Sequence, residues 1–249
     1  MRTVLALSIL LFSTFCMAEK TLTVLVGMDK PPYIQLQDGT GFELELLRLV
    51  VQHMGYEAVF LHVPNARIRY LLEQGHGDIA TLQRAREPSM DLFYSMPYIR
   101  YQNAVISLRQ SELTIQHSQD LVRLRVIAFQ NASQVLGQDF AEMTEISRRY
   151  QETTNQKTQV DMLLADRVDA VVMDINIFHY FRRVANDNQP IQLHSLFPVS
   201  DYRAGFRERG LQRAFDKALA EVQQHDKYRQ LQLEFFGSVN QLTAIANTP

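Results

Sequence analysis

The chain has 249 residues, with 25 Lys and Arg against 27 Asp and Glu and a formal net charge of −2 at pH 7. A nearly neutral chain lacks the basic surface typical of nucleic-acid-binding domains, so we exclude nucleic acid as a partner. The length is enough for one large lobe or two small lobes, each with its own core.

The first 18 residues have the pattern of an export signal. Arg2 provides a basic start, residues 4–15 are almost entirely apolar, and Ala18 is a small residue at the expected cleavage site. This apolar run is too short to cross a bilayer as a helix, and no later run is long enough. The sequence therefore predicts a soluble mature protein that is exported to the periplasm.

Cysteine usage excludes several kinds of chemistry. Cys16 is the only cysteine of the chain, and it leaves with the export signal. The mature protein therefore has no disulfide, no thiol nucleophile and no thiolate metal site. The seven histidines show no spacing typical of metal ligands, so we expect no metal and no cofactor.

The segment that follows the export signal alternates patterns typical of strands and helices, which predicts an α/β fold. Two consecutive strand–helix–strand units form one lobe with right-handed crossovers. Gly55 and Gly75 are expected to end the two helices. The expected elements are a strand at 22–26, a loop with two prolines at 27–33, a helix at 42–54, a strand at 58–63, a helix at 66–74 and a strand at 79–82.

A second α/β unit is expected after an extended crossing segment at residues 103–108. Residues 196–199 are expected to return the chain to the first lobe. The last helix has the clearest pattern, because its apolar residues at 211, 215, 218, 219 and 222 lie on one face. The other expected elements are a strand at 125–129, a helix starting at 134–140, a helical face at 160–164, a strand at 170–173, a helix at 175–184 and an apolar helical face at 228–235.

Residues 75–98, GHGDIATLQRAREPSMDLFYSMPY, resemble the hinge-side signature of the family 3 periplasmic solute-binding proteins. In that family a Gly-x-x-Asp turn leads into a buried strand, a loop with an arginine and an aromatic-Ser-x-Pro-Tyr segment. Weaker resemblances occur in the family's order at 32–33, 41–44, 166–174 and 211–236. Together the similarity covers about residues 22–237.

The resemblance implies a two-lobed, periplasmic binding protein-like α/β fold, with two strands crossing a hinge and a ligand cleft between the lobes. Interdomain clefts are common sites for small molecules, and hinge closure around the ligand is the expected motion. The implied organisation is an export signal at 1–18, the first part of lobe 1 at 19–103, lobe 2 with a crossing strand at 104–196, the return to lobe 1 with the C-terminal helices at 197–238, and a flexible tail at 239–249.

The implied function is the capture of a small zwitterionic or acidic metabolite, such as an amino acid, for an ABC importer. The protein would be a monomer that docks on an ABC permease. Modules of this family also serve as extracytoplasmic sensors that dock on a membrane receptor. A third interpretation is a dehydratase acting on a cyclic prephenate-like acid, for which Glu87 is the nearest candidate general acid. The sequence has no P-loop, nucleophile elbow or dinucleotide fingerprint, so we predict that it is not an enzyme.

The resemblance assigns the ligand's charged groups to three residues. Asp174 ends an apolar strand where the family binds a ligand ammonium, and a partly desolvated carboxylate needs a cationic partner in any case. The alternative is that Asp174 only caps the next helix. Arg86 and Arg84 lie where the family binds the ligand carboxylate, which a guanidinium fits with two hydrogen bonds. Either arginine could instead be a solvated loop residue.

Six further residues complete the candidate ligand-binding set. Asn131 and Ser133 form a polar turn whose backbone N–H groups suit an anion, or which only caps the next helix. Lys30 takes a position that is often aromatic in amino-acid-binding members, and Arg67 lies at the entry of the second helix. Tyr33 offers aromatic surface, and Gln83 precedes Arg84. The sequence has no tryptophan, so a more polar or acidic ligand than an amino acid stays open.

Overall fold

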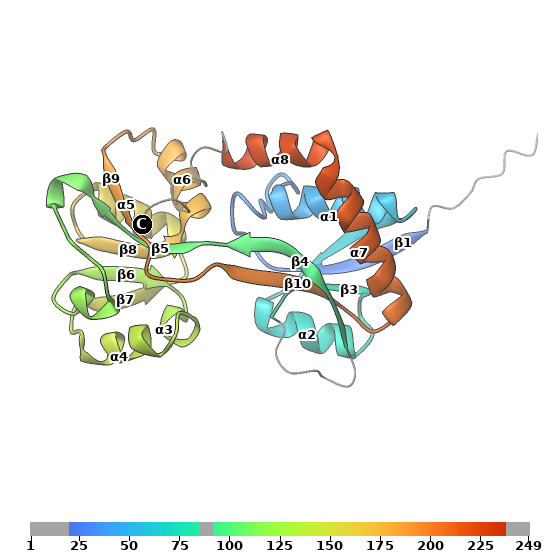
Figure 1. Ribbon diagram of the computed structural model, residues 1–249, viewed down its shortest axis with the longest axis horizontal. Coiled ribbons are helices and arrows are strands. Elements are labelled where there is room, and N and C mark those ends of the chain that lie inside the picture. The colour runs from blue at the N-terminus through green and yellow to red at the C-terminus, as the bar shows by residue number, and fades with distance from the viewer. Residues whose placement is uncertain (1–19, 85–91, 238–249) are drawn as a thin grey trace, which may run out of the picture.

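The computed structural model describes residues 20–84 and 92–237. The predicted export signal at 1–18 and tail at 239–249 lie outside the described residues, as do Arg86 and Glu87. Within the described part of the chain, no helix has the length and apolar character needed to cross a membrane. The described residues form two α/β lobes that lie side by side along the long axis of Figure 1.

The first lobe contains a five-stranded sheet in the order β2-β1-β3-β10-β4. β1 is parallel to β2 and β3, and such neighbours need the helical crossovers that α1 and α2 provide. β10 is antiparallel to β3 and β4. The elements are β1 (Thr21–Val26), α1 (Phe42–His53), β2 (Glu57–His62), α2 (Asn65–Glu73), β3 (Ile79–Gln83), β4 (Phe93–Tyr101) and β10 (Ser200–Phe206).

The second lobe contains a five-stranded sheet in the order β7-β6-β8-β5-β9. β6 is parallel to β7 and β8, and β5 is antiparallel to β8 and β9. Its strands are β5 (Asn103–Leu108), β6 (Val126–Phe129), β7 (Tyr150–Thr153), β8 (Ala170–Asp174) and β9 (Ile191–His194). Its helices are α3 (Ala132–Val135), α4 (Gln138–Ile146), α5 (Gln156–Leu164) and α6 (Ile175–Val184), with short 3-10 turns at Arg109–Ser111 and Ser118–Leu121.

Two segments cross between the lobes (Figure 1). Only Gln102 separates β4 from β5, and residues 195–199 connect β9 to β10. The Gln102 side chain ties the two crossings together, because its Nε2 donates to the Phe197 carbonyl at 2.9 Å. The backbone N–H of Gln102 donates to Asp174 Oδ2, also at 2.9 Å. The end of strand β8 is therefore fixed to the hinge.

Two C-terminal helices, α7 (Arg209–Gln224) and α8 (Asp226–Phe236), complete the first lobe. Phe215 and Leu219 on the apolar face of α7 are fully buried. α8 also reaches the second lobe, since Arg183 of α6 donates to the Phe235 carbonyl at 3.1 Å. The C-terminal helix pair thus contacts both halves of the molecule.

The predicted elements of the first lobe agree with the structure, but four strands were not predicted: β4, β7, β9 and β10. These strands are only partly buried, so their sequences lack the continuous apolar runs that reveal β6 and β8. The expected crossing segment at 103–108 is instead β5, whose residues are all buried between β8 and β9. The helix expected to start at 134–140 is two helices, α3 and α4, separated at Gly137, where φ is +101°.

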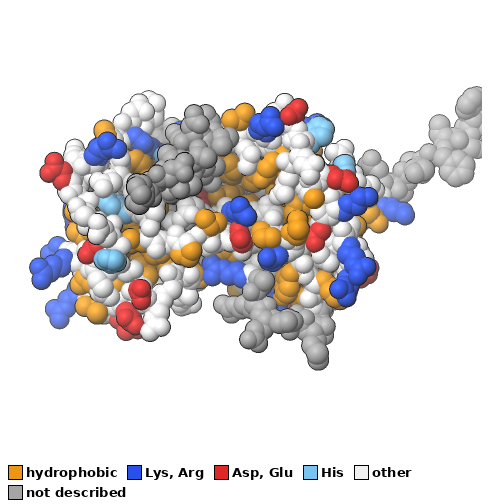
Figure 2. Space-filling model, viewed as in Figure 1, with side chains coloured by type: hydrophobic (Ala, Val, Ile, Leu, Met, Phe, Trp, Pro, Cys, Tyr) orange, Lys and Arg blue, Asp and Glu red, His pale blue; other side chains and the backbone are white. Residues whose placement is uncertain are grey.

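Figure 2 shows Lys, Arg, Asp and Glu side chains of both signs interspersed on the visible face. One exposed pair joins neighbouring strands, because Arg100 of β4 lies 2.8 Å from Asp201 of β10. Such exposed pairs contribute little to stability. Other charged side chains lie between the lobes.

Candidate ligand-binding site

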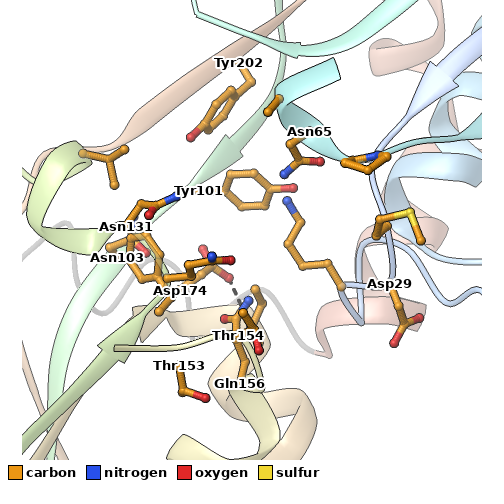
Figure 3. Close-up of a pocket in the computed structure, with 18 of the residues that line it drawn as sticks. Asp29, Asn65, Tyr101, Asn103, Asn131, Thr153, Thr154, Gln156, Asp174 and Tyr202 are labelled. Carbon is orange, nitrogen blue, oxygen red and sulfur yellow. Dashed lines mark hydrogen bonds between the residues drawn. The ribbon is translucent and has the colours of Figure 1, made fainter. Parts of the chain in front are cut away.

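A cavity of about 590 Å³ lies between the two lobes. Figure 3 shows side chains from both lobes converging on it, with Asn65 and Tyr101 on one side and Asp174 and Asn131 on the other. Its volume is within the range of small-molecule sites. The lining residues are Met28, Asp29, Lys30, Pro64, Asn65, Ala66, Arg84, Tyr101, Asn103, Phe129, Gln130, Asn131, Val135, Thr153, Thr154, Gln156, Asp174, Ile177 and Tyr202.

Lys30 brings a cation into this cavity from the loop after β1. Its ammonium lies 4.4 Å from the centre of the Tyr101 ring, a favourable cation–π distance. Burial lowers the pKa of Lys30, and the negative charges of Glu43 and Asp174 partly oppose that shift. The two negative charges therefore favour the charged form of Lys30, which burial disfavours.

Arg84 adds a second cation at the end of β3. Its guanidinium donates to the Tyr202 hydroxyl at 3.0 Å and lies 5.2 Å from the centre of that ring. The Tyr101 and Tyr202 rings are themselves in edge-to-face contact, with centres 5.2 Å apart. The two cations therefore flank one pair of tyrosines.

Asp174 is buried at the cavity and is held by four donors. Its Oδ1 accepts from the Tyr33 hydroxyl at 3.1 Å and from the N–H groups of Asn176 and Ile177 at 2.9 and 3.1 Å. Its Oδ2 accepts from the Gln102 N–H. Burial raises the pKa of Asp174 to about 6, although these hydrogen bonds oppose the shift. Asp174 is thus both the N-cap of α6 and a cavity residue.

The raised pKa of Asp174 predicts a dependence of stability on pH. The folded state holds this proton up to about pH 6, whereas the unfolded state loses it near the ordinary value of 3.8. The free energy of unfolding therefore decreases from pH 4 to pH 7, by about 3 kcal/mol from this group. Urea unfolding of the wild type and Asp174→Asn across this range should show this contribution only in the wild type. Parallel curves would contradict it, and Asp139→Asn serves as the control at an exposed carboxylate.

Behind Lys30 lies a second buried carboxylate, Glu43 in the first turn of α1. It accepts hydrogen bonds from the hydroxyls of Tyr98 at 2.5 Å and Tyr101 at 3.5 Å. Burial raises the pKa of Glu43, and the nearby charge of Lys30 opposes the shift. Glu43 was not predicted as a site residue, because its spacing in α1 is that of an ordinary acidic residue in a first helical turn.

The polar turn predicted to bind an anion is already hydrogen-bonded to a carboxylate of the chain. Glu152 of β7 accepts from the N–H groups of Asn131 at 2.5 Å and Ser133 at 2.9 Å, and from the Tyr150 hydroxyl at 2.8 Å. Asn131 lines the cavity and has a left-handed backbone with φ of +64°, whereas Ser133 is not part of the lining. The role of both residues in binding stays a prediction.

The other predicted residues are placed as follows. Tyr33 is fully buried behind Asp174, and its hydroxyl also accepts from Asn176 Nδ2 at 2.9 Å. The Gln83 side chain is buried and donates to the Thr81 carbonyl at 2.7 Å, and Arg67 is exposed on α2. None of these three residues lines the cavity. Arg86, the favoured carboxylate ligand, lies outside the described residues.

Several polar lining residues were not singled out from the sequence. Thr153 ends β7, a strand that was not predicted, and Thr154 and Gln156 come shortly after it. Asn103 begins β5. The signal that could have found them is their common position at strand or helix ends that face the hinge. Within the described ranges, no cluster of three or more His, Cys, Asp or Glu side chains could hold a metal ion.

Solved structures of similar fold include a ligand-bound receptor core, a sensor domain and a probable transporter binding protein. The ligand-binding core of GluR0 in complex with L-glutamate is 17% identical, with a TM-score of 0.69 over 88% of this chain and 100% of that one. A histidine kinase sensor domain with similarity to periplasmic binding proteins is 18% identical, with a TM-score of 0.68 over 88% and 97%. The probable amino-acid ABC transporter extracellular-binding protein ytmK from Bacillus subtilis is 20% identical, with a TM-score of 0.69 over 88% and 100%.

The TM-scores show a shared fold, and sequence identities this low do not show a shared ligand. None of the curated proteins matches the sequence. The sequence model of one family, however, matches residues 22–238, which is nearly the whole described chain. With the two lobes and the interlobe cavity, this match shows that the chain belongs to the bacterial extracellular solute-binding proteins, family 3.

Proposed function

We propose that this protein binds a small solute bearing at least one carboxylate, outside the cytoplasmic membrane, in the cavity between its lobes. The observation that supports this most directly is the cavity lining, which combines residues of both lobes with the cations Lys30 and Arg84. A guanidinium forms strong paired hydrogen bonds with a carboxylate. Residues 1–18 would direct the protein to the periplasm.

Binding is proposed to close the two lobes. Arg84 belongs to the first lobe and Asp174 to the second, so a solute that contacts both sides is held fully only when the lobes approach. A ligand with more contacts in the closed form shifts the population toward that form. The solute would be an amino acid held through its carboxylate and ammonium, or an organic acid held through its carboxylates alone.

The bound solute is proposed to be delivered to an ABC importer by a monomeric protein. Neighbours of the same fold include a probable binding protein of an amino-acid ABC transporter. A second candidate is a sensor that docks on a membrane receptor, which the similarity to a histidine kinase sensor domain favours. Pull-down against the permease or receptor encoded beside the gene distinguishes the two outputs.

A thermal-shift screen tests solute binding. Residues 19–249 are screened against amino acids, di- and tricarboxylates, polyamines and aromatic acids. A ligand at 100 times its Kd should add about 2.7 kcal/mol and raise the Tm by about 5–10 °C. Arg84→Met should weaken binding of the best compound by about tenfold to a hundredfold, whereas Arg213→Met, at an exposed position of α7, should not. If no carboxylate-bearing compound shifts the Tm, the proposal fails.

A further inference from the structure

The ammonium of Lys30 has unused hydrogen-bonding capacity at the cavity. Within residues 20–84 and 92–237 it contacts the Tyr101 ring, but no carboxylate or other acceptor lies within bonding distance of it. Glu43 and Asp174 act on Lys30 only through longer-range attraction. Because an ammonium has three donors, Lys30 can donate to an acceptor that enters the cavity.

The guanidinium of Arg84 also has unused hydrogen-bond donors. In the described part of the chain its guanidinium has a single hydrogen-bond acceptor, the Tyr202 hydroxyl, and no carboxylate partner. A guanidinium has five N–H donors, so most of its capacity is also available. Since Lys30 and Arg84 flank adjoining tyrosines, an elongated solute could reach both cations at once.

Among the described residues, the two carboxylates that line the cavity, Asp29 and Asp174, are poor partners for a ligand ammonium. Both oxygens of Asp174 are engaged by protein donors, and the positive charge of Lys30 lies near that carboxylate. Asp29 is exposed to solvent and accepts from the Leu36 N–H at 2.9 Å. A ligand ammonium would therefore leave water without gaining an unengaged buried carboxylate, which is costly.

We propose that the solute is a dicarboxylate without an amino group, and that Lys30 selects for it. This inference rests on the proposed solute-binding function and specifies its ligand class. Arg84 binds one carboxylate and Lys30 binds the other. The Lys30 ammonium provides the positive charge next to Asp174 and Glu43 that the amino group of an amino acid would otherwise bring. Repulsion by Lys30 then disfavours a solute with its own ammonium.

Matched pairs of compounds test the selection, because each pair differs only in the amino group. The pairs are succinate and aspartate, glutarate and glutamate, and adipate and 2-aminoadipate, titrated calorimetrically into residues 19–249. We expect at least one dicarboxylate to bind about tenfold or more tightly than its amino counterpart. Asp139→Asn, at an exposed position of α4 outside the cavity lining, should leave this preference unchanged.

Variants of Lys30 test its role. Lys30→Met removes the charge but keeps an unbranched side chain, and should weaken the best dicarboxylate by about tenfold to a hundredfold. Its amino counterpart should be weakened less, so that the preference shrinks. Lys217→Met, at an exposed position of α7, is the control for the loss of a lysine. A purely structural role of Lys30 would weaken both members of a pair equally, and circular dichroism checks that the variant is folded.

The possible outcomes separate this inference from the proposed function. If glutamate, aspartate or 2-aminoadipate binds as tightly as its dicarboxylate, the selection by Lys30 is wrong and solute binding stands. If the only compound that binds is a carboxylate-bearing one outside these pairs, the selection by Lys30 is likewise wrong and solute binding stands. If no carboxylate-bearing compound binds at all, both proposals fail. A preference for a dicarboxylate that survives in Lys30→Met overturns the assignment of Lys30 alone.

Discussion

Gly41→Ala is expected to lower the free energy of unfolding by about 3–5 kcal/mol. Gly41 precedes α1 with φ of 127° and ψ of 153°, a conformation almost restricted to glycine. A Cβ at this position would lie 2.3 Å from the Tyr33 carbonyl oxygen and 2.9 Å from Ile34 Cα. Both are backbone atoms, and they cannot move easily because the Tyr33 carbonyl also accepts from the Glu43 N–H at 3.0 Å.

Two other glycines show whether this cost comes from the backbone conformation or from the close contact of the added Cβ. Gly39 also has a positive φ of 62°, but a Cβ added there would have no atom within 4 Å, so Gly39→Ala should cost only about 1 kcal/mol. Gly210 lies in α7 with open space around it, and Gly210→Ala should stabilise the protein by up to about 1 kcal/mol. Urea unfolding measures all three. A cost for Gly41→Ala no greater than that for Gly39→Ala would show that the backbone contact is unimportant.

The tight contact at Gly41 also matters for the site. The Phe42 N–H donates to the Pro32 carbonyl at 2.9 Å, so the start of α1 is fastened to the loop that contains Lys30 and Tyr33. Lys30 reaches the cavity from one end of this loop, and Tyr33 reaches Asp174 from the other. A displaced loop in Gly41→Ala should therefore weaken solute binding as well as stability.

The fold was largely predictable from the sequence because its main signals are local. Apolar runs at β1, β6 and β8, and the apolar faces of α1 and α7, mark the buried core directly. The partly buried strands β7 and β9 have no such signal, and their place is set by pairing with β6 and β5. Pairing between residues far apart in sequence cannot be deduced from the local pattern.

The site was predictable only in part. Lys30, Arg84, Asn131 and Asp174 were placed among the candidates, and the structure brings all four to one cavity. The sequence did not reveal that Asp174 already has four donors, or that Glu152 occupies the N–H groups near Asn131. Those contacts join segments from different parts of the chain, so they follow from the tertiary structure and not from any motif.

The largest expected effect of a single buried charge is at Glu43. Glu43→Ala should lower the free energy of unfolding by about 3–5 kcal/mol, because it leaves the buried Tyr98 hydroxyl without its acceptor and removes the stronger of the two attractions, from Glu43 and Asp174, that act on Lys30. Glu43→Gln keeps an oxygen acceptor for Tyr98 and should cost less, about 1–2 kcal/mol. Urea unfolding at pH 7 measures both variants.

Glu45 provides the matched control, since it lies two residues further along the same helix. It is partly exposed and pairs with Arg48, so Glu45→Ala should cost no more than about 1 kcal/mol. Equal costs for Glu43→Ala and Glu45→Ala would contradict a special role for the buried carboxylate. Because Glu43 raises the pKa of Lys30, its loss also favours the neutral amine. Dicarboxylate binding should therefore weaken in Glu43→Gln, which stays folded, and should be unchanged in Glu45→Ala.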